Sequence, residues 1–251
     1  MADKPRKAGT GTPMIEAIGL AKFYGVFAAC RDVTFTVSEG ELVAFLGPNG
    51  AGKSTTMKLL TGYLSPSQGV AKIAGHDMAT DRIAGSQRLG YLPENGPLYP
   101  DMNPSSLLEF FADARGMSAA YKRERIEAVI DLCDLGSVVY KPIGKLSKGY
   151  RQRVGMAQTL LHEPDVLILD EPTAGLDPNQ IREVRHTMRK LGETKTILLS
   201  THILQEVEAL ASRVILINEG RVVYDGTVQD LDPKGEGLDK AFHKLTGAAA
   251  A

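Results

Sequence analysis

The stretch "LVAFLGPNGAGKSTTMKLLTG", Leu42 to Gly62, runs from an apolar segment through a glycine-rich loop into a segment of helix-forming residues. Its middle part, "GPNGAGKST", fits the pattern G-x-x-x-x-G-K-[ST], in which backbone N–H groups wrap around phosphate oxygens. Lys53 can reach the β- and γ-phosphates of a nucleotide, the Ser54 hydroxyl can coordinate Mg²⁺, and the following helix adds the positive end of its dipole. The sequence therefore predicts a phosphate site formed by Gly47, Pro48, Asn49, Gly50, Ala51, Gly52, Lys53, Ser54 and Thr55.

The run "VLILDE", Val166 to Glu171, is the expected partner of this loop. It is an apolar strand that delivers Asp170 and Glu171 at its carboxyl end, where α/β sheets bind their ligands. We expect Asp170 to hold Mg²⁺ through water and Glu171 to polarise the attacking water as a general base. Together the two motifs predict a nucleoside triphosphatase and leave many families of phosphate-loop proteins open.

Short apolar runs rich in Val, Ile and Leu predict the strands of a parallel sheet that is covered on both faces. Segments with helical spacing, which begin at Ile181 and Ile203, alternate with them. This alternation predicts an α/β fold, a phosphate-loop triphosphatase core with a mainly parallel sheet. The expected strands are Leu42–Leu46, Val166–Leu169, Ile197–Leu199 and Val214–Ile217.

Two regions interrupt this alternation. The segments that precede residue 46 and the late run "INEGRVVYDG", residues 217–226, look like hairpins and predict an antiparallel β edge. The region of about residues 95–150 is mostly helical, with a helix start at Asn103-Pro104, and predicts an inserted α-helical lobe. We therefore expect a disordered tail at 1–13, a single ATPase domain at 14–240 and a flexible end at 241–251.

The composition limits the compartment and the partners. The 251 residues carry a formal net charge of −1, which disfavours a nucleic-acid binder. No apolar run approaches the ~18 residues that span a bilayer, and no apolar segment follows the basic N-terminus as in a targeting signal. Two cysteines, Cys30 and Cys133, predict reduced core thiols of a cytosolic protein rather than a disulfide framework.

A second anion-binding pattern narrows the family. The run "LSKGYRQRV", Leu146 to Val154, resembles the signature motif of ATP-binding cassette (ABC) ATPases, usually written LSGGQ. The resemblance extends from about Ile15 to Thr227, with every motif in the order of the family. "EPTAGLDP" looks like the family's D-loop, and Tyr24 in "KFYG" stands where the family stacks an aromatic ring on adenine. The chain is thus identified as an ABC transporter ATPase subunit, similar to cassettes of the drug-export and gliding-motility type.

Among the histidines, only His202 has a functional context, because "STH", Ser200–His202, looks like the switch histidine of the family and follows a predicted strand. The resemblance therefore implies Lys53, Glu171 and His202 as catalytic residues. The remaining four histidines are expected at the surface, namely His76, His162, His186 and His243.

The resemblance also implies a site shared between two cassettes. In this family two subunits dock head to tail, so that each ATP lies between the phosphate loop of one subunit and the signature helix of the other. Ser147 would then bond the γ-phosphate, and the Gly149 N–H would approach it without obstruction by a side chain. Asp177 has two expected roles of equal weight, a D-loop contact across the interface and the N-cap of the helix that follows it.

Three positions depart from the family pattern. Lys148 replaces a glycine of the signature and Tyr150 replaces its glutamine. Lys148 is expected either to add positive charge near the γ-phosphate or to point to solvent, with solvent preferred. Glu94 stands where the family usually has a glutamine that helps to ligate Mg²⁺, and it keeps an oxygen ligand while adding a negative charge.

The implied function is that of the ATP-hydrolysing subunit of an ABC transporter, with ATP and Mg²⁺ as cofactors. We expect a cytoplasmic protein, peripheral on the inner face of the membrane, that works as a homodimer or with a second cassette and drives a separate transmembrane permease, without nucleic acid as a partner. Export is preferred, because the short segment after Gly226 leaves no room for the large regulatory domain of many sugar-importer cassettes. An importer cassette and a soluble ABC ATPase acting on nucleic acid or ribosomes are the alternatives.

Overall fold

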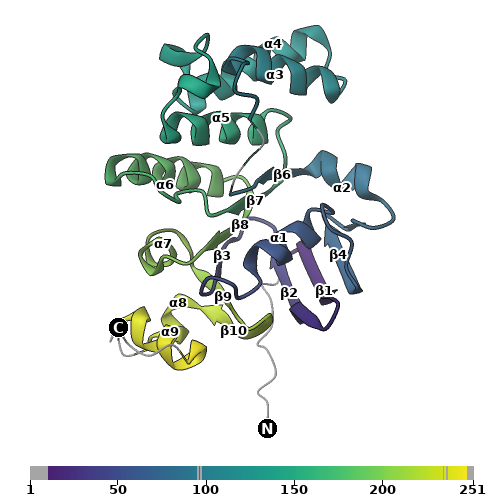
Figure 1. Ribbon diagram of the computed structural model, residues 1–251, viewed down its shortest axis with the longest axis vertical. Coiled ribbons are helices and arrows are strands. Elements are labelled where there is room, and N and C mark those ends of the chain that lie inside the picture. Colours follow the sequence, from purple (N-terminus) through teal and green to yellow (C-terminus); the bar gives the residue numbers. More distant parts are fainter. Residues whose placement is uncertain (1–10, 95, 97, 234, 236, 248–251) are drawn as a thin grey trace.

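The computed structural model describes residues 11–94, 96, 98–233, 235 and 237–247. It has two sheets with a helix between them and a helical region at one end (Figure 1). The expected tail at 1–13 lies outside the described residues as far as residue 10, and the expected flexible end at 241–251 lies outside them from residue 248. Residues 241–246 belong to helix α9 (Leu238–Thr246).

The larger sheet has the strand order β10-β9-β3-β8-β7-β6. Its strands pair in parallel except for β10, which pairs antiparallel with β9 through the turn at Glu219-Gly220. All five residues of β7 are buried, as expected for a strand covered on both faces. The four predicted strands and the late hairpin are therefore confirmed. The bounds are β3 Leu42–Leu46, β6 Leu89–Leu92, β7 Val166–Asp170, β8 Thr196–Thr201, β9 Arg213–Asn218 and β10 Arg221–Thr227.

The register of this sheet brings the sequence motifs together. Leu46 at the end of β3 pairs with Thr201 of β8, and Asp170 at the end of β7 pairs with Ser200 of β8. The glycine-rich loop, the two carboxylates and His202 therefore follow three adjacent parallel strands at one edge, where such sheets bind ligands.

The smaller sheet is antiparallel, with the order β2-β1-β4-β5, and confirms the predicted antiparallel edge. Helix α1 (Lys53–Leu60) lies between the two sheets (Figure 1). Its Met57 shares one apolar core with Ile15 of the smaller sheet and Phe45 of the larger one. The strands are β1 Pro13–Tyr24, β2 Phe27–Ser38, β4 Gln68–Ile73 and β5 His76–Asp77; β4, β5 and helix α2 (Arg82–Arg88) had no clear sequence signal.

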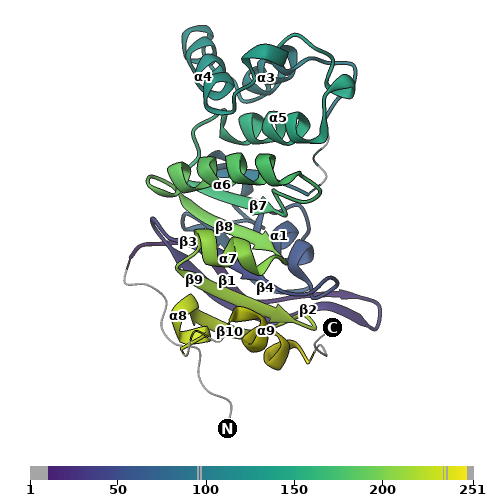
Figure 2. The ribbon, with the colours of Figure 1, turned by 90° about the vertical axis from the view of Figure 1, so that its left-hand side faces the viewer.

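The helical lobe follows β6 and stands at the far end of the molecule from α9 (Figures 1 and 2). Asn103 caps its first helix as predicted, because its side-chain oxygen accepts a hydrogen bond from the Ser106 N–H at 2.9 Å. Leu107 of the lobe shares an apolar core with Leu167 of β7, so the lobe is anchored on the sheet. Its helices are α3 Pro104–Ala114, α4 Ala119–Leu132 and α5 Lys148–Leu160, with short 3-10 turns at Gly136–Val138 and Ile143–Lys145.

Helices α6 (Pro178–Gly192) and α7 (Leu204–Leu210) cover the face of the large sheet opposite α1 (Figures 1 and 2), and α8 (Val228–Leu231) follows β10. The apolar spacing that predicted α6 corresponds to its buried Val184, Met188 and Leu191. Within the described ranges, none of the helices combines the length and apolar character needed to cross a membrane.

Two predictions for single residue types have different outcomes. Cys30 and Cys133 are free and buried, which confirms them as core thiols. The surface position predicted for His162 is wrong, since its ring is partly buried and its Nε2 lies 3.0 Å from the Leu89 carbonyl oxygen. Burial lowers the pKa of His162 to about 4. The end of α5 packs against β6 at this point, a long-range contact that has no local sequence signal.

Candidate functional site

A cavity of ≈ 560 Å³ lies at the carboxyl edge of the large sheet, within the usual size range for ligand sites of about 300–1,000 Å³. It brings together predicted residues from the ends of three strands. Its lining consists of Phe27, Ala29, Asn49, Gly50, Gly52, Lys53, Ser54, Thr55, Glu94, Glu171, Ala174 and His202.

The glycine-rich loop is wedged between the two sheets. A Cβ atom on Gly47 would lie 2.4 Å from the Ile217 carbonyl oxygen of β9, and a Cβ atom on Gly52 would lie 2.5 Å from the Ala29 carbonyl oxygen of β2. Gly52 also has a φ of 103°, which favours glycine. These two glycines are therefore required for close backbone packing, which fixes the loop relative to both sheets.

Lys53 is the first residue of α1 and is only 6% exposed. Its Nζ donates hydrogen bonds to the carbonyl oxygens of Gly47 at 2.8 Å and Pro48 at 3.2 Å. The same atom lies 3.5 Å from Glu171 Oε1. The ammonium group is thus held inside the loop, where a bound phosphate would compete with these oxygens for it.

Glu171 leaves β7 with a φ of 51° and is 8% exposed. Its Oε2 lies 2.7 Å from His202 Nδ1, and its backbone N–H donates to the Ser200 carbonyl oxygen at 3.0 Å. With Lys53 on the other carboxylate oxygen, the side chain is oriented from both sides. The structure thus joins Lys53, Glu171 and His202, three residues far apart in the chain, into one contiguous set.

Asp170 is 2% exposed, and its Oδ1 has no hydrogen-bond partner among the described residues. Burial raises the pKa of Asp170; the Ser200 and Ser54 hydroxyls oppose this, and the nearby Glu171 and Glu94 carboxylates reinforce it. An unpaired carboxylate oxygen beside a hydroxyl fits a hard cation. In the described parts of the chain, no cluster of three or more His, Cys, Asp or Glu side chains could hold a metal, so Mg²⁺ here would take further ligands from phosphate and water.

Glu206 is a site residue that the sequence analysis missed. It lies on α7 with no exposed surface and accepts hydrogen bonds from the hydroxyls of Thr173 and, at 2.6 Å, Thr201. Thr173 follows Glu171 by two residues, and Thr201 directly precedes His202. The buried carboxylate therefore ties together the two loops that carry Glu171 and His202. The sequence did contain a signal for its burial, because residue 206 lies on the same helical face as the apolar stripe that begins at Ile203.

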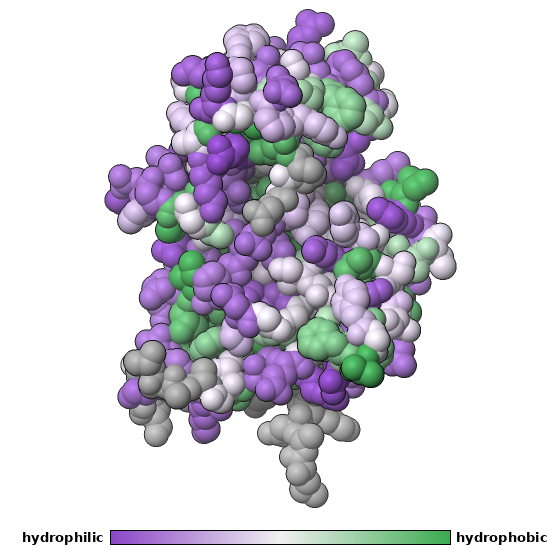
Figure 3. Space-filling model, viewed as in Figure 1, coloured by the Kyte–Doolittle hydropathy of each residue, from purple (hydrophilic) through white to green (hydrophobic). Residues whose placement is uncertain are grey.

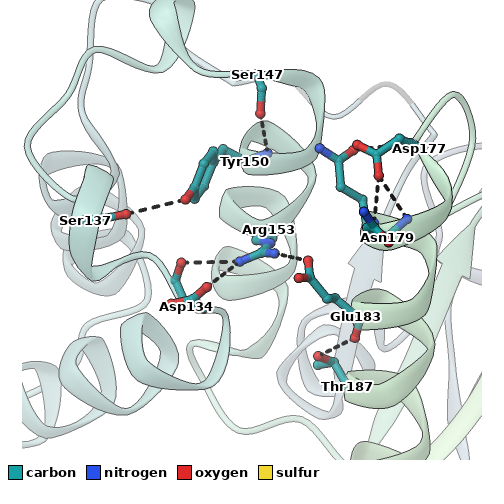
Figure 4. A network of polar contacts seen from close by, with 10 residues as sticks. Asp134, Ser137, Ser147, Tyr150, Arg153, Asp177, Asn179, Glu183 and Thr187 are labelled. Carbon is teal, nitrogen blue, oxygen red and sulfur yellow. Dashed lines mark hydrogen bonds and ion pairs between the residues drawn. The ribbon is translucent and has the colours of Figure 1, made fainter.

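Ser147, Gly149 and Asp177, which we call the signature face, do not line this cavity. Ser147 caps its own helix, since its Oγ accepts from the Tyr150 N–H at 3.3 Å (Figure 4). Gly149 is buried against the same chain, where an added Cβ would lie 2.5 Å from the side chain of Gln180. Within one chain, the structure therefore keeps the signature face apart from the phosphate loop.

Asp177 caps α6, which is one of the two roles expected for it; the other, a D-loop contact across an interface, stays a prediction. Its Oδ1 accepts from the N–H groups of Asn179 at 2.9 Å and Gln180 at 3.0 Å (Figure 4). Gln180 returns a contact to the Asp177 N–H at 3.4 Å, which completes a capping box. Gln180 thus touches Gly149 and Asp177 together, so the starts of α5 and α6 form one unit.

Lys148 and Tyr150, the two residues that differ from the signature motif of the family, lie next to different neighbours. Tyr150 places its ring 5.3 Å from the guanidinium of Arg153, which in turn bonds Asp134 of the lobe at 2.8 Å and Glu183 of α6 (Figure 4). Lys148 is exposed, and its Nζ would lie 2.2 Å from a Cβ atom on Gly175. The side chain of Lys148 therefore reaches along the surface to the loop that precedes Asp177.

Tyr24 lies at the end of β1 and is 52% exposed. It is not among the residues that line the cavity, whereas Phe27, on the opposing strand, is. The predicted contact between Tyr24 and a nucleobase thus remains a prediction, and Phe27 and Ala29 are wall residues that the motifs did not indicate.

Comparison with known proteins identifies the family. The family model described as ABC transporter matches residues 30–174. The chain is 39% identical to the ABC transporter ATP-binding protein NatA of Bacillus subtilis (strain 168), over 86% of this chain and 90% of that protein. It is 37% identical to the probable multidrug ABC transporter ATP-binding protein YbhF of Escherichia coli (strain K12), over 88% of this chain and 39% of that protein.

A solved structure agrees with these relatives. The structure of cbiO1 from Clostridium perfringens, described as part of the ABC transporter complex cbiONQ, has a TM-score of 0.80 and 27% identity. It covers 90% of this chain and 92% of its own. The chain is therefore a member of the ABC transporter family, an ATP-binding subunit of the kind that hydrolyses ATP to power transport.

Proposed function

We propose that this subunit binds MgATP in the cavity at the sheet edge, hydrolyses it as one of two head-to-tail cassettes, and powers export through a separate membrane permease. The observation that carries the catalytic part is the orientation of Glu171 between Lys53 and His202. Residues 14–240 would form the single cassette domain, with the helical lobe inserted in it from about residue 95 to the end of α5 at Leu160.

In this proposal Glu171 is the general base. His202 holds one carboxylate oxygen, which leaves the other, near Lys53, at the end of the cavity where the γ-phosphate would lie. A base must lie within hydrogen-bonding reach of the water whose proton it takes, and a fixed carboxylate meets this condition. Lys53 would stabilise the charge that develops on the transferred phosphoryl group.

Ser54, Asp170 and Glu94 are the residues that would hold Mg²⁺, which when bound would neutralise charge on the β- and γ-phosphates. The unpaired Oδ1 of Asp170 supports this assignment. Glu94 lines the same cavity as Ser54, so its carboxylate is available on the solvent side.

The signature face would complete the site of a second copy or of a second cassette. Ser147 and Gly149 stand at the N-terminal end of α5, a 13-residue helix whose dipole favours anions. Their separation from the cavity of their own chain supports a contact in trans. Asp177 would add the D-loop contact while it caps α6.

The membrane partner would dock beside the lobe, near Glu94–Asp101, of which residues 95 and 97 lie outside the described part. Tyr99 and Phe110 are each 49% exposed there, with ring centroids 6.1 Å apart. The cassette would then lie on the cytoplasmic face of the membrane, without nucleic acid as a partner. The multidrug name of the relative YbhF favours export, and an importer cassette is the alternative.

The variant Glu171→Gln tests this proposal. It should bind MgATP, lose about 10²–10⁴-fold in hydrolysis, and accumulate as an ATP-bound dimer that co-purifies with a polytopic membrane protein. ATPase assays, gel filtration with MgATP and pull-down from membranes measure these outcomes, with Glu193→Gln at the exposed end of α6 as the control. Near-normal turnover would remove Glu171 from its role, and capture of ribosomes or DNA instead would favour the soluble alternative.

A further inference from the structure

The tip of the β1–β2 hairpin forms one wall of the cavity. Tyr24 pairs with Phe27 and Phe23 pairs with Ala28 across the two strands. Because opposed residues of an antiparallel pair share a face and successive residues alternate, Tyr24, Phe27 and Ala29 lie on one face and Phe23 lies on the other. Phe27 and Ala29 both line the cavity, so this face is turned towards it.

The strand β2 also leads away from the phosphate loop. The Ala29 backbone abuts Gly52, since a Cβ on that glycine would lie 2.5 Å from the Ala29 carbonyl oxygen. Phe27 is two residues earlier, which corresponds to about 7 Å along a strand. A nucleotide with its phosphates in the loop would therefore pass Ala29 with its sugar and reach Phe27 with its base.

The two aromatic rings on this face differ in what already touches them. The Lys22 Nζ lies 5.7 Å from the centroid of the Tyr24 ring and donates to the Ser65 carbonyl oxygen at 2.7 Å, so Tyr24 already has a cation near it. Phe27 is 63% exposed, and within the described residues no ring or cation packs on its own ring. Figure 3 shows apolar surface over this hairpin tip, at the lower right of the view.

We propose that Phe27 is a second base-contacting residue, whose ring packs on the nucleobase of the bound nucleotide beside the position assigned to Tyr24. This inference rests on the proposed function, because it takes the phosphates to lie in the Gly47–Thr55 loop. A phenyl ring has no polar group that reads the edge of a base, and stacking tolerates any base. Phe27 therefore adds affinity for nucleoside triphosphates without selecting adenine over guanine.

Equilibrium binding with two probes tests this inference: MgATP, and inorganic tripolyphosphate with Mg²⁺, which has the phosphates but no base. Phe27→Ala should weaken MgATP about 5- to 150-fold and leave tripolyphosphate unchanged. Phe27→Leu, which keeps an apolar side chain without the ring, should behave like Phe27→Ala, and Phe27→Tyr should restore binding. MgGTP should lose affinity by the same factor as MgATP.

Phe23→Ala is the matched control, because Phe23 is an aromatic residue of the same hairpin, 40% exposed, on the opposite face. It should bind both probes like the unchanged protein. Unchanged MgATP affinity in Phe27→Ala, or an equal loss for both probes, would overturn the proposal. If Tyr24→Ala weakens MgATP while Phe27→Ala does not, the role of Phe27 fails and the proposed site stands. If the unchanged protein binds MgATP no better than tripolyphosphate, the base-binding site itself fails.

Discussion

The cavity and the signature face differ in how their polar groups are satisfied. In the cavity, Glu171 contacts both Lys53 and His202, and Lys53 also bonds the glycine-rich loop, so one chain holds all three in place. On the signature face, the side chains of Ser147 and Asp177 cap their own helices (Figure 4). Both residues are exposed. The register of the large sheet assembles the cavity, whereas the signature face consists of two helix N-termini at the surface of the molecule. In the proposed function, the cavity can thus be tested within one chain, whereas the signature face acts only on the nucleotide of a second cassette.

The largest expected effect tests this division directly. Lys53→Ala should abolish ATP binding, whereas Ser147→Arg should keep it and lose dimerisation and hydrolysis, because a bulky cation would stand at the start of α5. Mixing the two inactive variants should restore part of the activity, since a mixed dimer assembles one composite site from intact halves. ATPase assays across mixing ratios measure this. Mixed dimers that form but never hydrolyse ATP would contradict the contact in trans or require both sites intact.

The next largest effect is expected at Glu206, which does not line the cavity but bonds the two loops that carry Glu171 and His202. Glu206→Ala leaves the hydroxyls of Thr173 and Thr201 without their acceptor and frees the two loops that they belong to. Misplacement of a catalytic group by ~1 Å costs about 10²-fold, so we expect kcat to fall by that order while the affinity for ATP changes little. Glu206→Gln keeps the shape and one acceptor oxygen and should be intermediate.

A double variant separates positioning from general loss of stability. If Glu206 acts through His202 and Glu171, then Glu206→Ala should add little to the defect of His202→Ala. Glu208→Ala, an exposed neighbour on the same helix, is the control. Multiplicative losses in the double variant would show that Glu206 acts elsewhere.

Glu206 also marks the limit of what the sequence could predict. Motifs at strand ends were sufficient to predict the cavity, because the parallel register brings Ser54, Glu171 and His202 to one edge of the sheet independently of the other contacts of the fold. The role of Phe27 as a wall residue depends on how β2 packs on the phosphate loop, which no local pattern encodes. Glu206 is an acid among apolar neighbours, and the helical spacing alone places it in the interior without naming its partners.

On the signature face, the sequence was right about local chemistry and silent about contacts. The cap at Asp177 follows from helix-start rules and is present, and Ser147 in addition caps α5. The reason for glycine at 149 is partly different from the expected one, since the nearest obstruction is Gln180 of the same chain. Such a contact joins residues on two helices and requires the fold.

Glu94 allows a smaller effect to be measured inside the cavity. Glu94→Gln keeps an oxygen and removes one negative charge from the proposed metal position, so activity should survive with a weaker apparent affinity for Mg²⁺. If Glu94 holds Mg²⁺ as proposed, Glu94→Ala removes an oxygen ligand and should weaken that affinity by about 10-fold or more, with water replacing the lost ligand in part. Titrating Mg²⁺ against the ATPase rate of the three forms decides between them. Identical curves would make Glu94 a loop residue without a role at the metal.

The smallest effect at neutral pH is expected at His162, where α5 joins the sheet between the two regions. Its Nε2 must carry the proton that the Leu89 carbonyl oxygen accepts, and its Nδ1 is buried without a partner among the described residues. Protonation at Nδ1 would thus place a buried charge there, which burial chiefly opposes, together with the cations Arg115, Arg125 and Lys195. Because these lower the pKa of His162 to about 4, its contribution to stability is complete above the unfolded pKa of about 6.5 and is lost as the pH falls towards 4. At pH 5 the free energy of unfolding should be lower by about 2 kcal/mol for this reason.

His162→Gln keeps a donor for Leu89 and cannot titrate. Urea unfolding of this variant should therefore show a smaller loss in the free energy of unfolding between pH 7 and pH 5 than the unchanged protein. Parallel pH curves for the two proteins would place the acid sensitivity in other groups.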